Sequence, residues 1–280
     1  MTALLVALIV PAAAHAARSA DVAALQVALR ARGLYAGAVD GVRGPETGHA
    51  LRAFQRRARL GADGIAGPRT RHALGRHGRH PYGSRTLRPG RVGWDVAALQ
   101  FRLEMHGFPS GDVDGGYGWH VAAAVARFQR WAGLAVDGVA GPATLRALGS
   151  APIPACPIAL RRPVAAPVGD RFGPRGDRFH AGLDLPAPEG TRVRAAAGGR
   201  VVFAGHTGSG YGNLVVIAHG RGVRTRYAHL ERFGVRAGEA VAAGAVIGRV
   251  GETGDATGPH LHFEVLVRGA NADPQPALRL

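Results

Sequence analysis

Apolar residues recur at helical spacing in two stretches of the first half of the chain, whereas they alternate with polar residues in the last third. In the first stretch, Val22, Leu25 and Leu29 predict one helix. A second helix is expected around Leu51 and a short third one over residues 70–74. The turn signals "VDGVRGP" and "ADGIAGP" separate them, so this stretch predicts a small three-helix unit.

The same unit occurs a second time, without any gap, at an offset of 74 residues. "DVAALQVALRARGL" from Asp21 aligns with "DVAALQFRLEMHGF" from Asp95, and the later Asp-Gly and Phe-Gln pairs align as well. The copies share no cluster of acids, histidines or serines that would suggest catalysis. Four histidines differ between the copies and are expected on the exposed surface: His49, His72, His106 and His120.

After Pro167, short β-rich runs lie between glycines and predict a compact all-β domain: "GRVVFAG", "GNLVVIAHG", "VRTRYAHL", "AVIGRVG" and "HLHFEVLV". Successive side chains of a strand point to opposite faces. The last run should therefore place His260, His262 and Glu264 on one face and an apolar set on the other. The same alternation would put Tyr227 and His229 on one face of their strand.

Histidine and aspartate side chains of this β region suit a catalytic zinc site. His180 and Asp184 are typical zinc ligands in a segment expected to be irregular, and the His260–His262 pair offers a third ligand. Such a zinc keeps one position open for water and lowers the pKa of that water to about 7. The other histidine of the pair and His229 remain for proton transfer, but spacing does not tell which histidine of the pair binds metal. Glu264 is expected to support the site or to be exposed.

Ordered motifs extend over about residues 168–267: "H-AGLDL", "G-GYGN-VVI-HG", "YAHL" and "V--G--IG-VG-TG-ATGPHLHFEV". Together they resemble the lysostaphin-like, LytM-type zinc metallopeptidases. The resemblance implies a peptidoglycan endopeptidase with a small β-sheet core and a groove. It also implies that His180, Asp184 and His262 bind Zn²⁺, and that His229 and His260 are catalytic.

The two helical copies carry "AALQ-LR--GL", "DG--G--T--A---FQ" and "DG-AGP-T---L" in order, over residues 20–75 and 94–149. This pattern resembles the bacterial peptidoglycan-binding domain. The resemblance implies tethering to the wall, and two weak modules on one chain would raise retention through effective concentration. The shared positions are core and turn residues, so they assign no binding residue.

The N-terminus and the charge suggest where the protein works. "MTALLVALIVPAAAHA" has an apolar run followed by a small-x-small site, which predicts a signal peptide and a secreted, wall-associated protein. A membrane span is not expected, because it needs an apolar run of about 18 residues and the sequence has none of that length. With 35 basic and 19 acidic residues, the chain carries a net charge of +16 and would attract anionic wall polymers. Nucleic acid is not expected as a partner, because export and the absence of an aromatic recognition motif argue against it.

We therefore predict a multidomain α plus β protein: a signal peptide (1–16), a first helical module (19–75), a linker (76–92), a second helical module (93–149), a Pro-rich linker (150–167), a mainly antiparallel β-sheet metallopeptidase domain (168–270, the β domain) and a tail (271–280). The predicted function is that of a monomeric, secreted, zinc-dependent endopeptidase acting on stem peptides or cross-bridges of peptidoglycan. The alternative is a non-enzymatic wall-binding protein that regulates another hydrolase, against which the complete ligand set argues.

Overall fold

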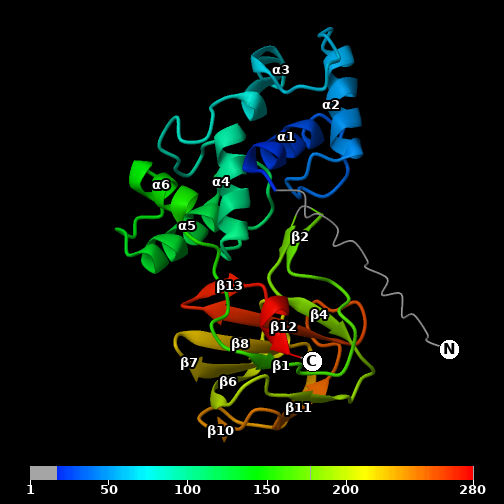
Figure 1. Cartoon of the computed structure of the whole chain (residues 1–280), viewed down its shortest axis with the longest axis vertical. Coiled ribbons are helices and arrows are strands. Elements are labelled where there is room, and N and C mark those ends of the chain that lie inside the picture. The colour runs from blue at the N-terminus through cyan, green and yellow to red at the C-terminus, as the bar shows by residue number, and fades with distance from the viewer. Residues whose placement is uncertain (1–17, 177, 280) are drawn as a thin grey trace, which may run out of the picture.

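The computed structural model describes residues 18–176 and 178–279, with helices at one end and β-sheet at the other (Figure 1). The predicted signal peptide lies outside these residues. The helical half consists of α1 (Ala20–Arg30), α2 (Pro45–Arg57), α3 (Pro68–Ala73), the 3-10 helix η1 (Gly75–Gly78), α4 (Trp94–Met105), α5 (Trp119–Ala132) and α6 (Pro142–Ser150). Within the described residues, no helix has the length and apolar character needed to cross a membrane.

Buried glutamines explain why both helical modules share the Gln and Asp-Gly positions. The Gln26 side chain donates to Asp40 Oδ1 at 2.7 Å and accepts from the Gly41 N–H at 3.0 Å. Gln100 makes the same pair of bonds in the second module, to Asp114 and Gly115. Both glycines have positive φ, which a side chain would disfavour. The shared motif thus holds a turn in place in each module.

The two helical modules pack directly on each other through α1 and α4 (Figure 1). Trp94 and Phe101 of α4 belong to the same buried cluster as Leu25 and Leu29 of α1. In addition, the Trp94 indole donates to Asp21 Oδ1 at 2.8 Å. The modules therefore form one joined helical body.

One of the four histidines expected on the helical surface is instead buried. His106 is 8% exposed, and its ring nitrogens contact the backbone carbonyls of Arg102 and Ala151 at 2.7 and 3.0 Å. The expectation fails because the ring closes the C-terminal end of α4, where free carbonyls need donors. The other three, His49, His72 and His120, are exposed, as expected.

The β half is built around an antiparallel seven-stranded sheet of order β10-β6-β7-β8-β12-β13, in which β4 also pairs with β12. A three-stranded sheet, β5-β11-β9, and two two-stranded sheets, β2-β3 and β1-β14, complete it. The strands are β1 (Leu160–Arg161), β2 (Gly173–Arg175), β3 (Arg178–His180), β4 (Leu183–Pro186), β5 (Arg192–Arg194), β6 (Gly199–Thr207), β7 (Gly212–Gly220), β8 (Val223–Ala228), β9 (Leu230–Phe233), β10 (Ala240–Val241), β11 (Val246–Val250), β12 (His260–Val267), β13 (Ala270–Ala272) and β14 (Leu278–Arg279), with the 3-10 helix η2 (Gln275–Ala277) before β14.

The alternation of β12 is confirmed: one face of the strand packs in the core, and the other carries His260, His262 and Glu264. Leu261, Phe263 and Val265 are completely buried in the core of the β domain, and the Phe263 ring lies 5.3 Å from that of Tyr227. The prediction that Tyr227 and His229 share a face is wrong. Tyr227 is in the core, whereas His229 has a φ of 60° and leaves the strand alternation. This left-handed turn lets the His229 ring face the other side of the sheet.

Segments outside the predicted β domain contribute to its packing. Leu160 and Val164, in the segment expected as a Pro-rich linker, are buried in its core. Strand β1 of that segment pairs in parallel with β14 of the tail. In the segment between the helical modules, Leu87 is completely buried and pairs with Ala140. These stretches are structured parts of the fold.

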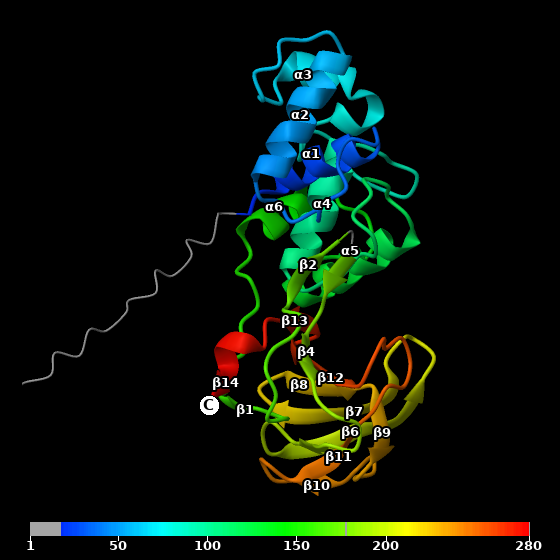
Figure 2. The ribbon, with the colours of Figure 1, turned by 90° about the vertical axis from the view of Figure 1, so that its right-hand side faces the viewer.

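The second helical module is docked on the β domain. In Figure 2 the β domain lies directly below α4 and α5 of this module. The Asn271 N–H of β13 donates to the Gly107 carbonyl at 2.9 Å. Ala270 joins the buried cluster of that module, and the Arg268 guanidinium lies 5.0 Å from the Trp131 ring. A Cβ at Gly107 would overlap the Asn271 backbone, so only glycine permits this close approach. The module and the β domain therefore share a packed contact.

Candidate metal centre

Three side chains predicted as metal ligands converge at the junction of β3, β4 and β12. His180 Nε2 lies 3.1 Å from Asp184 Oδ1 and 3.1 Å from His262 Nδ1. His262 Nδ1 lies 2.8 Å from the same carboxylate oxygen. The pairing of His262 with Asp184 in register across β12 and β4 produces this proximity. The segment carrying His180 and Asp184, expected to be irregular, consists of two short strands.

Both ligand histidines present a defined nitrogen to the centre. His180 Nδ1 donates to the Arg171 carbonyl at 2.9 Å, which leaves Nε2 unprotonated for a metal. His262 Nε2 donates to Glu264 Oε1 at 3.1 Å, which leaves Nδ1. The tautomers are thus set by hydrogen bonds on the far side of each ring.

Glu264 was expected either to support the site or to be exposed. It is buried beneath the site, so the first alternative is correct. It is 1% exposed and also accepts from Tyr211 Oη at 2.8 Å, Arg226 Nη1 at 3.0 Å and Asn271 Nδ2 at 3.1 Å. The sequence did not indicate these three partners. Only Arg226 had a possible signal, because it lies directly opposite Glu264 across β8 and β12.

His229 and His260 lie side by side next to the converging ligands. Their ring centroids are 4.7 Å apart, and His260 Nε2 is 3.7 Å from Asp184 Oδ1. His229 Nδ1 donates to the Thr253 carbonyl and His260 Nδ1 to the Gly258 carbonyl, both at 2.8 Å. Each ring therefore keeps Nε2 free to hold or move a proton.

All five histidine and aspartate side chains line one open groove of about 730 Å³. Tyr211 and Arg175 line it too, and Arg175 Nη1 donates to Asp184 Oδ2 at 3.3 Å. An extended peptide could reach the converging ligands from this groove.

The electrostatics of the centre favour a positive charge. Burial opposes ionisation of Asp184, but the adjacent imidazoles of His180 and His262 outweigh it and hold the pKa of that carboxyl well below its usual range. Burial also opposes a charged His262, yet the carboxylates of Asp184 and Glu264, one beside each ring nitrogen, raise the pKa of that imidazole to about 9, and a bound metal ion would replace the proton on Nδ1. Burial lowers the pKa of His229, which keeps it neutral near pH 7.

The donor set fits zinc. Bond lengths of about 2.0–2.2 Å in a tetrahedron place neighbouring ligand atoms about 3.3–3.6 Å apart. The separations of 2.8–3.1 Å among the three donors are slightly shorter, so a small outward movement would suffice. Two imidazoles and one carboxylate are also a ligand set of catalytic zinc sites. Among the described residues, this is the group that could hold a metal ion.

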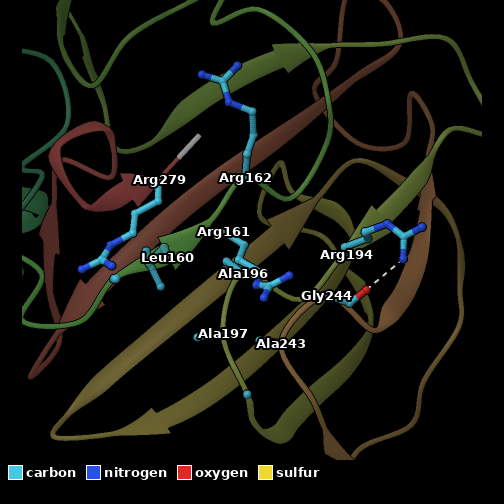
Figure 3. A pocket seen from close by; sticks show the side chains of 11 residues that line it. Leu160, Arg161, Arg162, Arg194, Ala196, Ala197, Ala243, Gly244 and Arg279 are labelled. Atoms are coloured by element: carbon cyan, nitrogen blue, oxygen red, sulfur yellow. Dashed lines mark hydrogen bonds between the residues drawn. The ribbon is translucent and has the colours of Figure 1, made fainter.

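A separate pocket of about 710 Å³ lies near β1, β5 and β14 (Figure 3). Four arginines line it, Arg161, Arg162, Arg194 and Arg279, and their side chains spread in different directions around a floor that includes Ala196 and Leu160. Within the described part of the chain, no acidic side chain lines the pocket and none of these arginines is in a salt bridge. Arg161 and Arg279 are direct partners across β1 and β14.

The site and fold define a β-sheet domain with a candidate metallohydrolase centre, preceded by two helical modules. Residues 178–274 match peptidase family M23, and residues 18–74 and 93–148 match the peptidoglycan binding domain family. The chain therefore carries one peptidase family M23 domain and two peptidoglycan binding domains.

Similar proteins include the DD-carboxypeptidase/endopeptidase Mpg of Neisseria meningitidis, 48% identical over 40% of this chain and 26% of its own length. The glycyl-glycine endopeptidase ALE-1 of Staphylococcus capitis is 41% identical over 36% of this chain and 29% of its own length. The catalytic domain of lysostaphin from Staphylococcus simulans is 36% identical, with 40% of this chain and 90% of that chain covered and a TM-score of 0.38. The matched region thus spans under a third of the length of either curated relative.

Proposed function

We propose that this protein is a zinc-dependent endopeptidase that hydrolyses peptide bonds in peptidoglycan stem peptides or cross-bridges. The observation that carries the proposal is the meeting of His180 Nε2, Asp184 Oδ1 and His262 Nδ1 in a groove, next to two histidines with a free Nε2. The relatives named above are called endopeptidases of different bonds, so the proposal is limited to the class of substrate. Secretion, retention in the wall and the predicted domain boundaries belong to the same proposal.

In this mechanism His180, Asp184 and His262 hold the zinc. When bound, the ion supplies a Lewis acid that activates water and polarises the scissile carbonyl. His229, neutral because of its burial, and His260 accept and return protons through Nε2 and stabilise the oxyanion as it develops. Glu264 holds the ring of His262 at the angle that its Nδ1 needs.

The proposal is tested by incubating purified cell walls with zinc-loaded, chelated and zinc-restored protein. We expect solubilisation of the walls with zinc, none after chelation and recovery after zinc is added back. Solubilisation that persists in the chelator would exclude the proposed chemistry.

Replacing Glu264 by glutamine should weaken zinc binding by about 10- to 100-fold, because the amide no longer fixes the His262 tautomer as a carboxylate does. Competition with a chromophoric chelator measures this affinity. Glu231→Gln, at an exposed position of β9, is the matched control. Equal affinities of the two variants would show that Glu264 does not position the ligand.

We also propose that the arginine pocket attracts anionic wall polymers. Its four guanidinium groups face different directions, which suits an extended polyanion that binds several of them. Changing all four to glutamine should make the dependence of wall binding on salt shallower, by about one unit of log–log slope for each anionic group that is no longer bound. The control is a variant with four arginines of the first helical module, none of them fully buried, changed in the same way: Arg56, Arg57, Arg59 and Arg69. The same change of slope in both variants would argue against a local site.

A further inference from the structure

A second cleft, of about 350 Å³, lies on the second helical module, away from the histidines of the candidate metal centre. Its lining comes from the segment before α4, from α4 itself and from the loop that leads into α5. Side chains that line it include Arg91, Ser110, Asp112, Asp114, Tyr117 and His120. Ser110 is 2% exposed, and its hydroxyl has no hydrogen-bond partner within the described residues. The cleft is thus polar, with two carboxylates and one guanidinium.

An exposed tryptophan stands beside this cleft. Trp119, the first residue of α5, is 72% exposed, the highest value for a large apolar side chain among the described residues. Its ring stacks on that of His120, which lines the cleft, with centroids 3.4 Å apart and an angle of 30°. Most of the indole is therefore accessible to a ligand bound beside it. The inclined pair of rings, here called the aromatic wall, lies at the edge of the polar cleft, with His120 on its lining.

The internal repeat shows that this wall is not part of the shared framework. The glutamine and Asp-Gly turn at the base of the cleft occur in both modules with the same hydrogen bonds. At an offset of 74 residues, however, the positions of the wall and lining differ. Ser110, Asp112, Trp119 and His120 correspond to Ala36, Ala38, Pro45 and Glu46 of the first module. The second module thus differs from the first by polar and aromatic groups at positions that do not hold its fold together.

The cleft also lies next to the groove of the candidate metal centre. Asp112, on its lining, pairs with Arg178 at 3.4 Å, and Arg178 lines the catalytic groove. The contact between Gly107 and Asn271 holds the module and the β domain together. A branched polymer bound in the cleft would therefore have a branch within reach of the groove.

We propose that this cleft binds the glycan strand of peptidoglycan, with one N-acetylated sugar ring packed on the wall formed by Trp119 and His120. The apolar face of a pyranose matches a flat indole, and sugar hydroxyls and acetamido N–H groups are donors for carboxylates such as Asp112. Two carboxylates against one guanidinium disfavour the carboxylates of a stem peptide. The inference rests on the proposed function in one respect: the peptide branch of the bound strand is what the groove would cut.

The test uses the full-length, zinc-loaded chain and two probes, a peptide-free N-acetylglucosamine tetrasaccharide and a sugar-free stem peptide. Calorimetry should detect the tetrasaccharide, and Trp119→Ala should weaken its binding at least about tenfold. Trp119→Phe should restore part of the affinity, because it keeps a flat ring. Ile65→Ala, which removes an apolar side chain that is 59% exposed on the first module, should leave the affinity unchanged.

Hydrolysis separates this inference from the proposed function. Trp119→Ala should cleave the sugar-free peptide at the rate of the unaltered protein but solubilise intact walls more slowly. If the unaltered protein fails to bind the tetrasaccharide, or if Trp119→Ala binds it equally well, the glycan site is refuted. If the tetrasaccharide binds but no peptide is cleaved, the glycan site stands and the endopeptidase proposal fails.

Discussion

Replacing His262 by alanine is expected to abolish zinc binding and peptidoglycan hydrolysis together. Replacing His260 by alanine is expected to lower kcat by about 10²- to 10⁴-fold while zinc stays bound, as for the loss of a group that transfers protons. The two residues are neighbours on one face of β12, but only His262 Nδ1 lies within 3.1 Å of both other ligand atoms. Metal analysis of the purified variants, together with rates on purified walls, distinguishes the two roles.

His206→Ala is the control for this pair, because His206 is an exposed histidine of the same β domain, outside the groove. It should keep both zinc and activity. A His262→Ala protein that retains one equivalent of zinc, or a His260→Ala protein that loses it, would reverse the assignment of the two histidines.

Replacing Phe263 by alanine should lower the free energy of unfolding of the β domain by about 3–5 kcal/mol, the range for a buried phenylalanine. Phe263 is completely buried and packs on Tyr227, so the truncation leaves a cavity in the centre of the core. The loss is a large part of the about 5–15 kcal/mol that stabilises a typical domain. Urea unfolding of the zinc-free protein measures it without the contribution of metal binding.

Phe233→Ala is the matched control, because that ring is 38% exposed on β9. Its effect should be much smaller than that of Phe263→Ala. If both substitutions cost the same, Phe263 does not have the central position in the core that the structure gives it.

The polar and apolar faces of β12 could be predicted from the sequence, because the alternation of side chains along a strand depends only on local backbone geometry. His260, His262 and Glu264 line the groove, while Leu261 and Phe263 fill the core. The two three-helix modules followed by a mainly antiparallel β-sheet were also predicted correctly, from helical spacing, the shared turns and the β-rich runs.

Other parts of the site could not be predicted because they depend on one dihedral angle or on distant contacts. The positive φ of His229 determines the side of the sheet to which its ring points, and no neighbouring residue type predicts that φ. The network around Glu264 joins Tyr211, Arg226 and Asn271, which are far apart in the chain and meet only when the strands pair. The packing of α1 on α4 could not be predicted either, because it depends on how the two modules contact each other in space.

The central claim is that the centre formed by His180, Asp184 and His262 hydrolyses a peptide bond when zinc is bound. The most direct measurement is mass spectrometry of the fragments released from purified peptidoglycan in ¹⁸O-labelled water, with zinc-loaded and with chelated protein. We predict fragments with a new amino terminus and a single ¹⁸O in the matching carboxylate, formed only when zinc is present. Fragments with new sugar ends and intact peptides, or the same fragments from the chelated protein, would contradict the claim.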